Sequence, residues 1–97
     1  MTQPQPVKVN LTRRPDFRES YANSVQMRVN LWDFYLEFGI VNQTDPEVVN
    51  IETFQGVYLS PQQAKALFNV LQQNVSQYES AFGEIKLDPR AASGIVQ

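Results

Sequence analysis

Alternating apolar and polar residues predict two neighbouring strands in the first half of the chain. The first run covers residues 25–29 and the second covers 34–40, and the side-chain period of two is that of a half-buried strand. Between them, residues 30–33 (Asn-Leu-Trp-Asp) have turn chemistry, because Asn and Asp side chains bond their own backbone. The predicted hairpin places Val29 opposite Phe34, Met27 opposite Leu36 and Val25 opposite Phe38.

A third strand is predicted over residues 49–59. It follows a loop at 42–47, which contains Asp45-Pro46, and Gly56 within the strand indicates a bulge. Closing the chain over this loop places Ile40 opposite Val49, Phe38 opposite Ile51 and Leu36 opposite Thr53. One sheet face then collects the apolar residues, and a one-residue slip would expose them all. The expected set is Val25, Met27, Val29, Phe34, Leu36, Phe38, Ile40, Val49 and Ile51.

A single long helix is predicted over residues 61–82. Ser60 is a hydroxyl N-cap, Pro61 suits the first helical position, and Gln63 completes the pattern of a capping box. Gly83 is the expected left-handed terminator. The apolar residues fall at steps of three and four, at Ala64, Leu67, Phe68, Leu71, Val75, Tyr78 and Phe82. Such a helix is ~33 Å long, whereas seven-residue strands reach ~23 Å, so it exceeds its own sheet.

These elements predict an α+β fold, an antiparallel three- to four-stranded meander packed on one long C-terminal helix. The expected organisation is a flexible basic arm at 1–19, one domain at 20–88 and a tail at 89–97. Weaker alternation at 7–11 and 85–87 leaves two further short strands open.

The composition limits the chemistry. The chain has 97 residues without histidine or cysteine, so common bases, nucleophiles and transition-metal ligands are missing, and we expect neither cofactor nor metal. What remains is a pair of carboxylates, Glu37 and Glu52, which the predicted register puts opposite each other. The simpler interpretation is an exposed acidic patch, in which the positive charge of Arg28 reduces the repulsion between the two carboxylates. An open sheet face does not exclude water, as a catalytic pocket would. We therefore expect no enzyme activity, with a carboxylate-based enzyme as an alternative.

Charge and aromatic residues point instead to a protein partner. Residues 1–30 hold five cations and two anions, whereas residues 31–84 hold one cation and seven anions. The negative charge of residues 31–84 argues against a nucleic-acid partner. The predicted register also places Tyr35 opposite Phe54 on the outer sheet face, with Arg28 beside Tyr35 and Trp32 at the nearby turn, and aromatic residues with arginine are typical of interface centres. The expected partner-binding residues are Arg28, Trp32, Tyr35, Phe54 and Tyr58.

Three sequence motifs resemble those of a small prokaryotic family of unknown function. They are Tyr21-Ala22-Asn23-x-Val25, Asp33-Phe34-x-Leu36-x-Phe38-Gly39 and Ser60-Pro61-Gln62-x-Ala64-Lys65, continued by Leu67, Leu71, Asn74, Tyr78-Glu79 and Phe82-Gly83. The resemblance covers 20–83, supports one domain and implies no activity. At the level of fold alone, strands followed by a long helix also resemble the export chaperone SecB.

The sequence thus predicts a non-catalytic protein-interaction module that self-associates through its sheet face or its helix. The alternative is a SecB-like holdase that binds unfolded chains. Residues 1–6 lack a signal-peptide pattern, and no run approaches the ~18 apolar residues of a membrane span, so we expect a cytoplasmic protein with no membrane contact.

Overall fold

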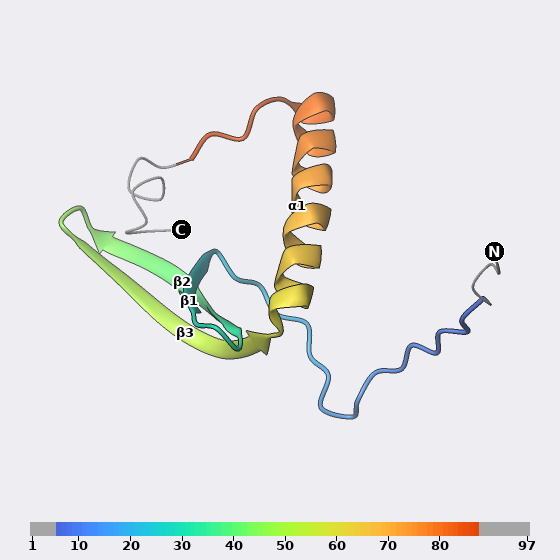
Figure 1. The fold of residues 1–97 in the computed structure, drawn as a ribbon. Helices are drawn as coiled ribbons and strands as arrows, with labels where there is room; N and C mark the ends of the chain where they lie inside the picture. The colour runs from blue at the N-terminus through green and yellow to red at the C-terminus, as the bar shows by residue number, and fades with distance from the viewer. Residues whose placement is uncertain (1–5, 88–97) are drawn as a thin grey trace.

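The computed structural model describes residues 6–87, which form a three-stranded antiparallel sheet followed by one helix (Figure 1). The strands are β1 (Ser24–Val29), β2 (Phe34–Asp45) and β3 (Val48–Leu59), in the order β1-β2-β3, and the helix is α1 (Pro61–Phe82). The predicted α+β meander is confirmed. The tail expected at 89–97 lies outside the described residues, as do the first five residues of the arm.

The register of β1 on β2 is the predicted one. Val29 pairs with Phe34, Met27 with Leu36 and Val25 with Phe38. The turn is held by Asn30, whose side-chain Oδ1 accepts hydrogen bonds from the backbone N–H groups of Trp32 (2.8 Å) and Asp33 (3.0 Å). A short polar side chain that bonds its own backbone thus fixes the hairpin, as the sequence indicated.

The register of β2 on β3 differs from the prediction. Both strands continue through most of the expected loop, and the turn contains only Pro46 and Glu47. Asp45 stabilises this turn, because its Oδ1 accepts from the Glu47 N–H at 2.8 Å. The shorter turn shifts the pairing along the chain: Leu36 lies opposite Val57 rather than Thr53, and Ile40 lies opposite Glu52 rather than Val49.

A bulge at Phe54 changes the facing of the first half of β3. Gly39 pairs with Thr53 and Phe38 with Gln55, so Phe54 is an extra residue on β3. An extra residue reverses the alternation beyond it. Ile51 therefore lies opposite Val41, on the other face from Ile40, and its predicted place among the apolar set is wrong. The predicted position of the bulge, at Gly56, is two residues away.

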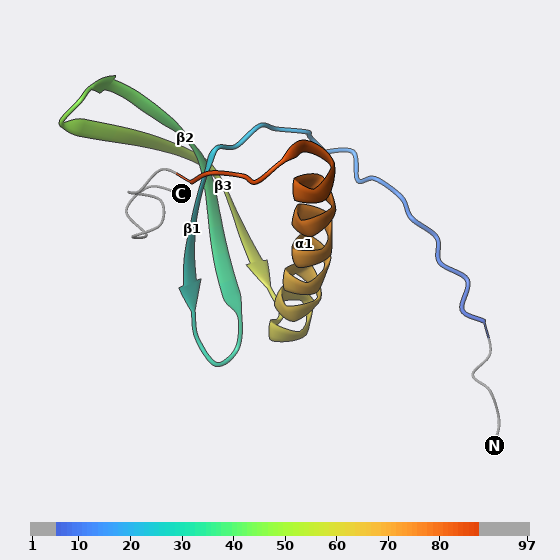
Figure 2. The ribbon, with the colours of Figure 1, turned by 90° about the horizontal axis from the view of Figure 1, so that it is seen from above.

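The β2–β3 hairpin projects beyond the rest of the sheet. β1 ends its pairing where Ser24 meets Gly39, so residues 40–53 form a ribbon of two strands. Figures 1 and 2 show this ribbon pointing away from both β1 and α1.

Both ends of α1 lie where the sequence placed them. The Ser60 side chain accepts from the Gln63 N–H at 3.1 Å, which supplies one of the two bonds of the capping box. At the other end, the Gly83 N–H bonds the Glu79 carbonyl at 2.9 Å. Gly83 has φ 103° and ψ 166°. This is not the expected left-handed helical conformation, but it is one that essentially only glycine adopts.

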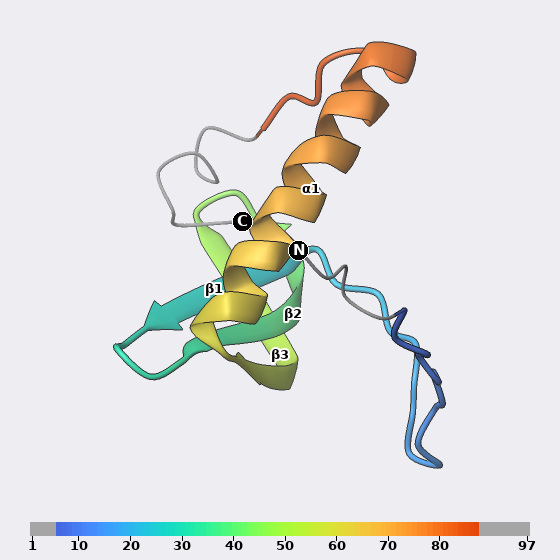
Figure 3. The same cartoon turned by 45° about the vertical axis from the view of Figure 1, so that its right-hand side comes forward.

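The helix contacts the sheet only near its own start. Pro61, Ala64 and Leu67 are half-buried, but no residue of α1 is buried, and the second half extends past the sheet (Figures 1 and 3). Leu71, at the centre of the apolar series that was expected to pack on the sheet, is 52% exposed. Among residues 6–87, Leu36 is the one large apolar side chain that is buried. The predicted apolar face exists, but most of it lacks a second layer within the chain.

The segment before β1 is extended and forms no strand. Asn23 still bonds β2, because its N–H donates to the Gly39 carbonyl at 3.1 Å and its Oδ1 accepts from the Val41 N–H at 2.7 Å. Toward residue 6 the segment leads away from the sheet, with a turn where the Phe17 N–H bonds the Arg14 carbonyl at 2.9 Å (Figure 1). Residues 7–11 and 85–87, where further strands were left open, are not strands in this structure. Within the described part of the chain, no helix combines the length and apolarity that crossing a membrane requires.

Candidate functional site

Three of the five expected partner-binding residues meet on one face of the sheet. Tyr35 at the start of β2 lies between Arg28 on β1 and Tyr58 on β3, its cross-strand neighbours on either side. The Arg28 guanidinium carbon lies 4.5 Å from the centre of the Tyr35 ring, and the centres of the two tyrosine rings are 4.7 Å apart. We call this set, Arg28, Tyr35 and Tyr58, the tyrosine cluster. It borders a shallow depression of about 170 Å³.

Glycine at position 56 allows this arrangement. A methyl group built on Gly56 would lie 2.7 Å from Cε1 and 2.9 Å from Cζ of Tyr35, so the ring lies directly against the glycine backbone. Gly56 thus has a packing role. The Tyr35 hydroxyl points along its own strand and donates a hydrogen bond of 2.7 Å to Glu37 Oε1.

The electrostatics of the tyrosine cluster favour a neutral phenol. The hydrogen bond to the Glu37 carboxylate raises the pKa of Tyr35 above its ordinary value of 10.0, as do partial desolvation and the charge of Glu37, while Arg28 opposes the shift. A tyrosine with a raised pKa is a hydrogen-bond donor at neutral pH rather than a base or nucleophile. The cluster therefore offers an aromatic surface with one cation beside it, a composition typical of contact surfaces.

The carboxylate pair expected from the sequence does not form. Glu37 lies opposite Gly56, and Glu52 lies opposite Ile40, three residues further along β2. The prediction failed because it rested on the wrong β2–β3 register. Within the described residues, no group of three or more acidic side chains is placed to hold a metal ion.

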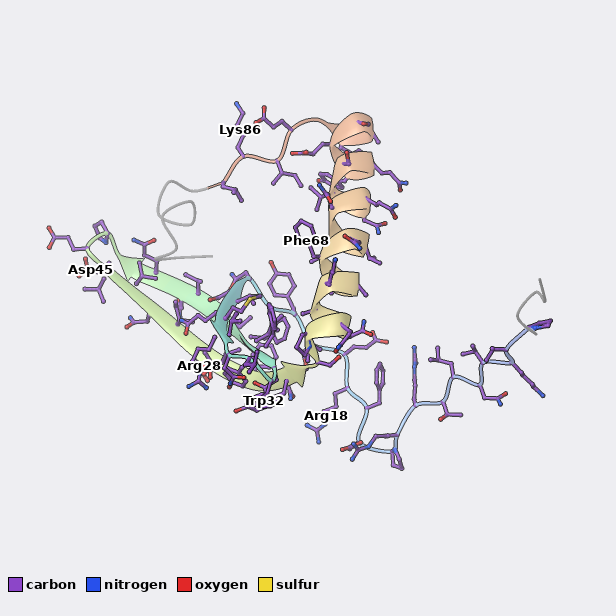
Figure 4. The ribbon with its side chains drawn as sticks, viewed as in Figure 1. Arg18, Arg28, Trp32, Asp45, Phe68 and Lys86 are labelled. Carbon is purple, nitrogen blue, oxygen red and sulfur yellow. The ribbon has the colours of Figure 1, made fainter. Side chains whose placement is uncertain are left out.

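Phe54 and Trp32 lie apart from the tyrosine cluster. Tyr35 was expected opposite Phe54 but pairs with Tyr58, and Phe54 shares a depression with Phe38, which strand alternation puts on the other face from Tyr35. Trp32 lies in the β1–β2 turn and is 79% exposed, on the same side of the molecule as Arg28 in Figure 4. The five residues therefore belong to three places on the surface.

The depression beside Phe54 joins the N-terminal segment to the sheet. It is an open hollow of about 680 Å³, lined by Asp16, Arg18, Ser20, Ala22, Phe38, Phe54 and Gln55. Its lining mixes two aromatic rings with one cation and one carboxylate. Such a surface suits contact with a chain rather than enclosure of a small molecule, because it is wide open to solvent.

A further surface was only partly foreseen by the sequence. The apolar side of α1 carries Phe68, Leu71, Val75, Tyr78 and Phe82, each at least 41% exposed. Phe68 points toward the sheet side of the helix, but the helix rises away from the sheet and leaves the stripe uncovered (Figure 4). We call these five residues the helix stripe. Its spacing was visible in the sequence. The expectation that the helix is longer than its sheet was wrong, because β2 and β3 each have 12 residues; the stripe is uncovered because α1 rises away from the sheet.

Comparison with known proteins identifies a family and nothing closer. A family model described as a protein of unknown function, DUF3467, matches residues 1–87. No curated protein and no solved structure matches. The likeness to SecB receives no support from these comparisons, whereas the resemblance to an uncharacterised family is confirmed.

Proposed function

The chain belongs to the DUF3467 family, whose description names no function, and we propose that it is a non-catalytic protein-binding module that self-associates through the helix stripe. One observation supports this proposal above the others. The helix stripe has the periodicity of a buried helix face, but all five of its residues are exposed in a single copy.

The area of the stripe is large enough to contribute substantially to an interface. Phe68, Tyr78 and Phe82 are 62%, 51% and 77% exposed. With roughly 200 Å² for each aromatic side chain, these three alone offer about 400 Å². A standard interface buries about 800 Å² on each partner. Leu71, Val75 and the exposed part of the sheet face supply further apolar area.

The charge of α1 favours a second copy as the partner. Its 22 residues include one lysine, Lys65, and one carboxylate, Glu79, and the remaining polar positions are Gln, Asn and Ser. Two such helices can approach each other without repulsion between like charges. A two-fold pair brings the same patch of each copy together, which is the commonest closed assembly of soluble proteins.

Mass in solution tests this proposal. Sedimentation velocity of the full chain at micromolar concentration should show a dimer or larger species, and Leu71→Asp should shift it toward the 11.1 kDa monomer. Gln73→Asp is the matched control, because it adds the same charge and the same poor helix former on the opposite side of α1.

Far-UV circular dichroism must show that Leu71→Asp still folds; if it does not, Tyr78→Glu takes its place near the end of the stripe. A parent chain that remains a monomer at hundreds of micromolar would refute the proposal. Equal dissociation by the Leu71 and Gln73 variants would show that the stripe is not the contact.

A further inference from the structure

The segment at residues 7–12 has the pattern of a strand but no strand to pair with. Val7, Val9 and Leu11 alternate with polar residues and are 84%, 78% and 94% exposed. In the structure, which describes the chain from residue 6, residues 7–12 form no hydrogen bond or ion pair. One side of this segment is therefore apolar and exposed, and its backbone groups have no hydrogen-bond partner among residues 6–87.

The projecting hairpin lacks a third strand. Over residues 40–53 it consists of two strands, and two-stranded hairpins are marginally stable alone. Within residues 6–87 no strand pairs with the outer edge of β3, because β3 is the last strand of the sheet. Between the turn at Pro46 and the bulge at Phe54, residues 48–53 present six consecutive strand residues at this edge. An uncovered edge of this kind is a template for an added strand.

The charges of the two segments are complementary. Residues 34–59 carry four carboxylates and no cation, with Asp45, Glu47 and Glu52 on the projecting hairpin. Residues 7–14 carry three cations and no carboxylate. Lys8 has no ion-pair partner among the described residues, whereas Arg14 pairs with Asp16 at 3.2 Å. The other free edge, that of β1, has six residues and carries Arg28, so it fits a basic segment less well.

We propose that residues 7–12 of one copy add a strand to residues 48–53 of β3 in a second copy, and that the exchange is reciprocal. The inference rests on the self-association proposed above and specifies a second contact within it. In a single copy the turn at Arg14–Phe17 carries the segment away from its own sheet (Figures 1 and 2). The apolar side of the added strand packs on the sheet, and Lys8 meets the carboxylates of the hairpin.

Paramagnetic relaxation between differently labelled copies tests the contact. The chain has no cysteine, so Thr12→Cys provides a unique site for a nitroxide at the end of the segment. This spin-labelled chain, at natural isotope abundance, is mixed with ¹⁵N-labelled parent chain, and amide signals of the parent are recorded. We expect broadening of residues 48–53 in the ¹⁵N-labelled copy. A nitroxide at Ser76→Cys, on the polar side of α1, is the control and should leave these signals sharp.

The outcomes separate this inference from the proposed function. A sample that sediments as a dimer but shows no broadening at residues 48–53 refutes the arm contact and leaves the helix-stripe proposal standing. Broadening confined to residues 40–45 would show that residues 7–12 pair with the edge of β2 instead of β3, and would also refute the contact as stated. A monomeric sample refutes both proposals.

A pair of proline variants tests whether the contact is a true strand. Successive N–H groups along a strand point to opposite sides, so only one of Val9 and Asn10 can donate to β3. Proline removes the N–H in either case. One of Val9→Pro and Asn10→Pro should therefore lose the broadening at residues 48–53, while the other keeps at least half of it. Equal loss or equal retention would contradict strand pairing.

Discussion

Alanine at Gly39 would place a methyl group against the backbone of β3. The new Cβ would lie 2.7 Å from the Glu52 carbonyl oxygen and 3.1 Å from the Thr53 Cα, where contacts between such atoms normally exceed about 3.4 Å. Backbone atoms cannot rotate away, so β2 and β3 must separate locally beside the Phe54 bulge. We expect strain of about 1–3 kcal/mol, offset by about 0.4–1 kcal/mol from the lower entropy of the unfolded chain. The net loss in the free energy of unfolding should be about 1–2 kcal/mol.

Gly56→Ala is the matched control for this prediction. Its methyl group would meet the side chain of Tyr35, which can rotate, so the loss in stability should stay below about 1 kcal/mol. Urea unfolding followed by far-UV circular dichroism measures both variants at one protein concentration, because the proposed self-association would make the midpoint depend on concentration. A Gly39→Ala variant as stable as the parent would refute the strand geometry at the bulge, as would a larger loss for Gly56→Ala.

Three further predictions concern the helix ends and the tyrosine cluster. Ser60→Ala removes the acceptor of the Gln63 N–H and should cost about 1 kcal/mol, measured in urea, whereas Gln62→Ala should cost much less. Gly83→Ala should cost about 1–3 kcal/mol through its backbone conformation alone, because no atom of residues 6–87 lies near the added methyl; no loss in thermal midpoint would contradict that conformation. The Tyr35 pKa is raised in the folded chain, so its contribution to stability is complete below pH 10 and is lost as pH rises through the raised value. Absorbance at 295 nm should show a late-titrating component from Tyr35, and Glu37→Ala should reduce that delay, because Glu37 is the largest cause of the raised pKa.

The sequence was sufficient where a local signal decided the structure. The Asn30 turn closes the first hairpin within four residues, and alternation on both sides leaves one register that buries the apolar set. The bounds of α1 follow from Ser60, Pro61 and Gly83, whose caps are made within the chain. No distant contact is needed for either element.

The second hairpin could not be derived in the same way. Residues 42–47 have the composition of a loop, but the exposed end of a two-stranded ribbon accepts the same residues, as Asn42, Gln43 and Asp45 show, so composition did not separate loop from strand. Alternation also permits the pairing of β3 with β2 to shift by an even number of residues, because each side chain then stays on the same face of the sheet. Leu36 moved from Thr53 to Val57 in this way, and the bulge then reversed residues 48–53. The candidate site inherited the error, because the pairs Tyr35–Phe54 and Glu37–Glu52 both depended on this register.

The small size of the buried core has a kinetic consequence. Leu36 is the one large apolar side chain buried among the described residues, so a lone copy gains little free energy from folding. If the remaining apolar area is covered by another copy, folding and encounter become a single bimolecular event. The folding rate then rises with abundance, and newly made chains remain accessible to proteases until a threshold concentration is reached. The amount of this protein in a cell would then set its lifetime.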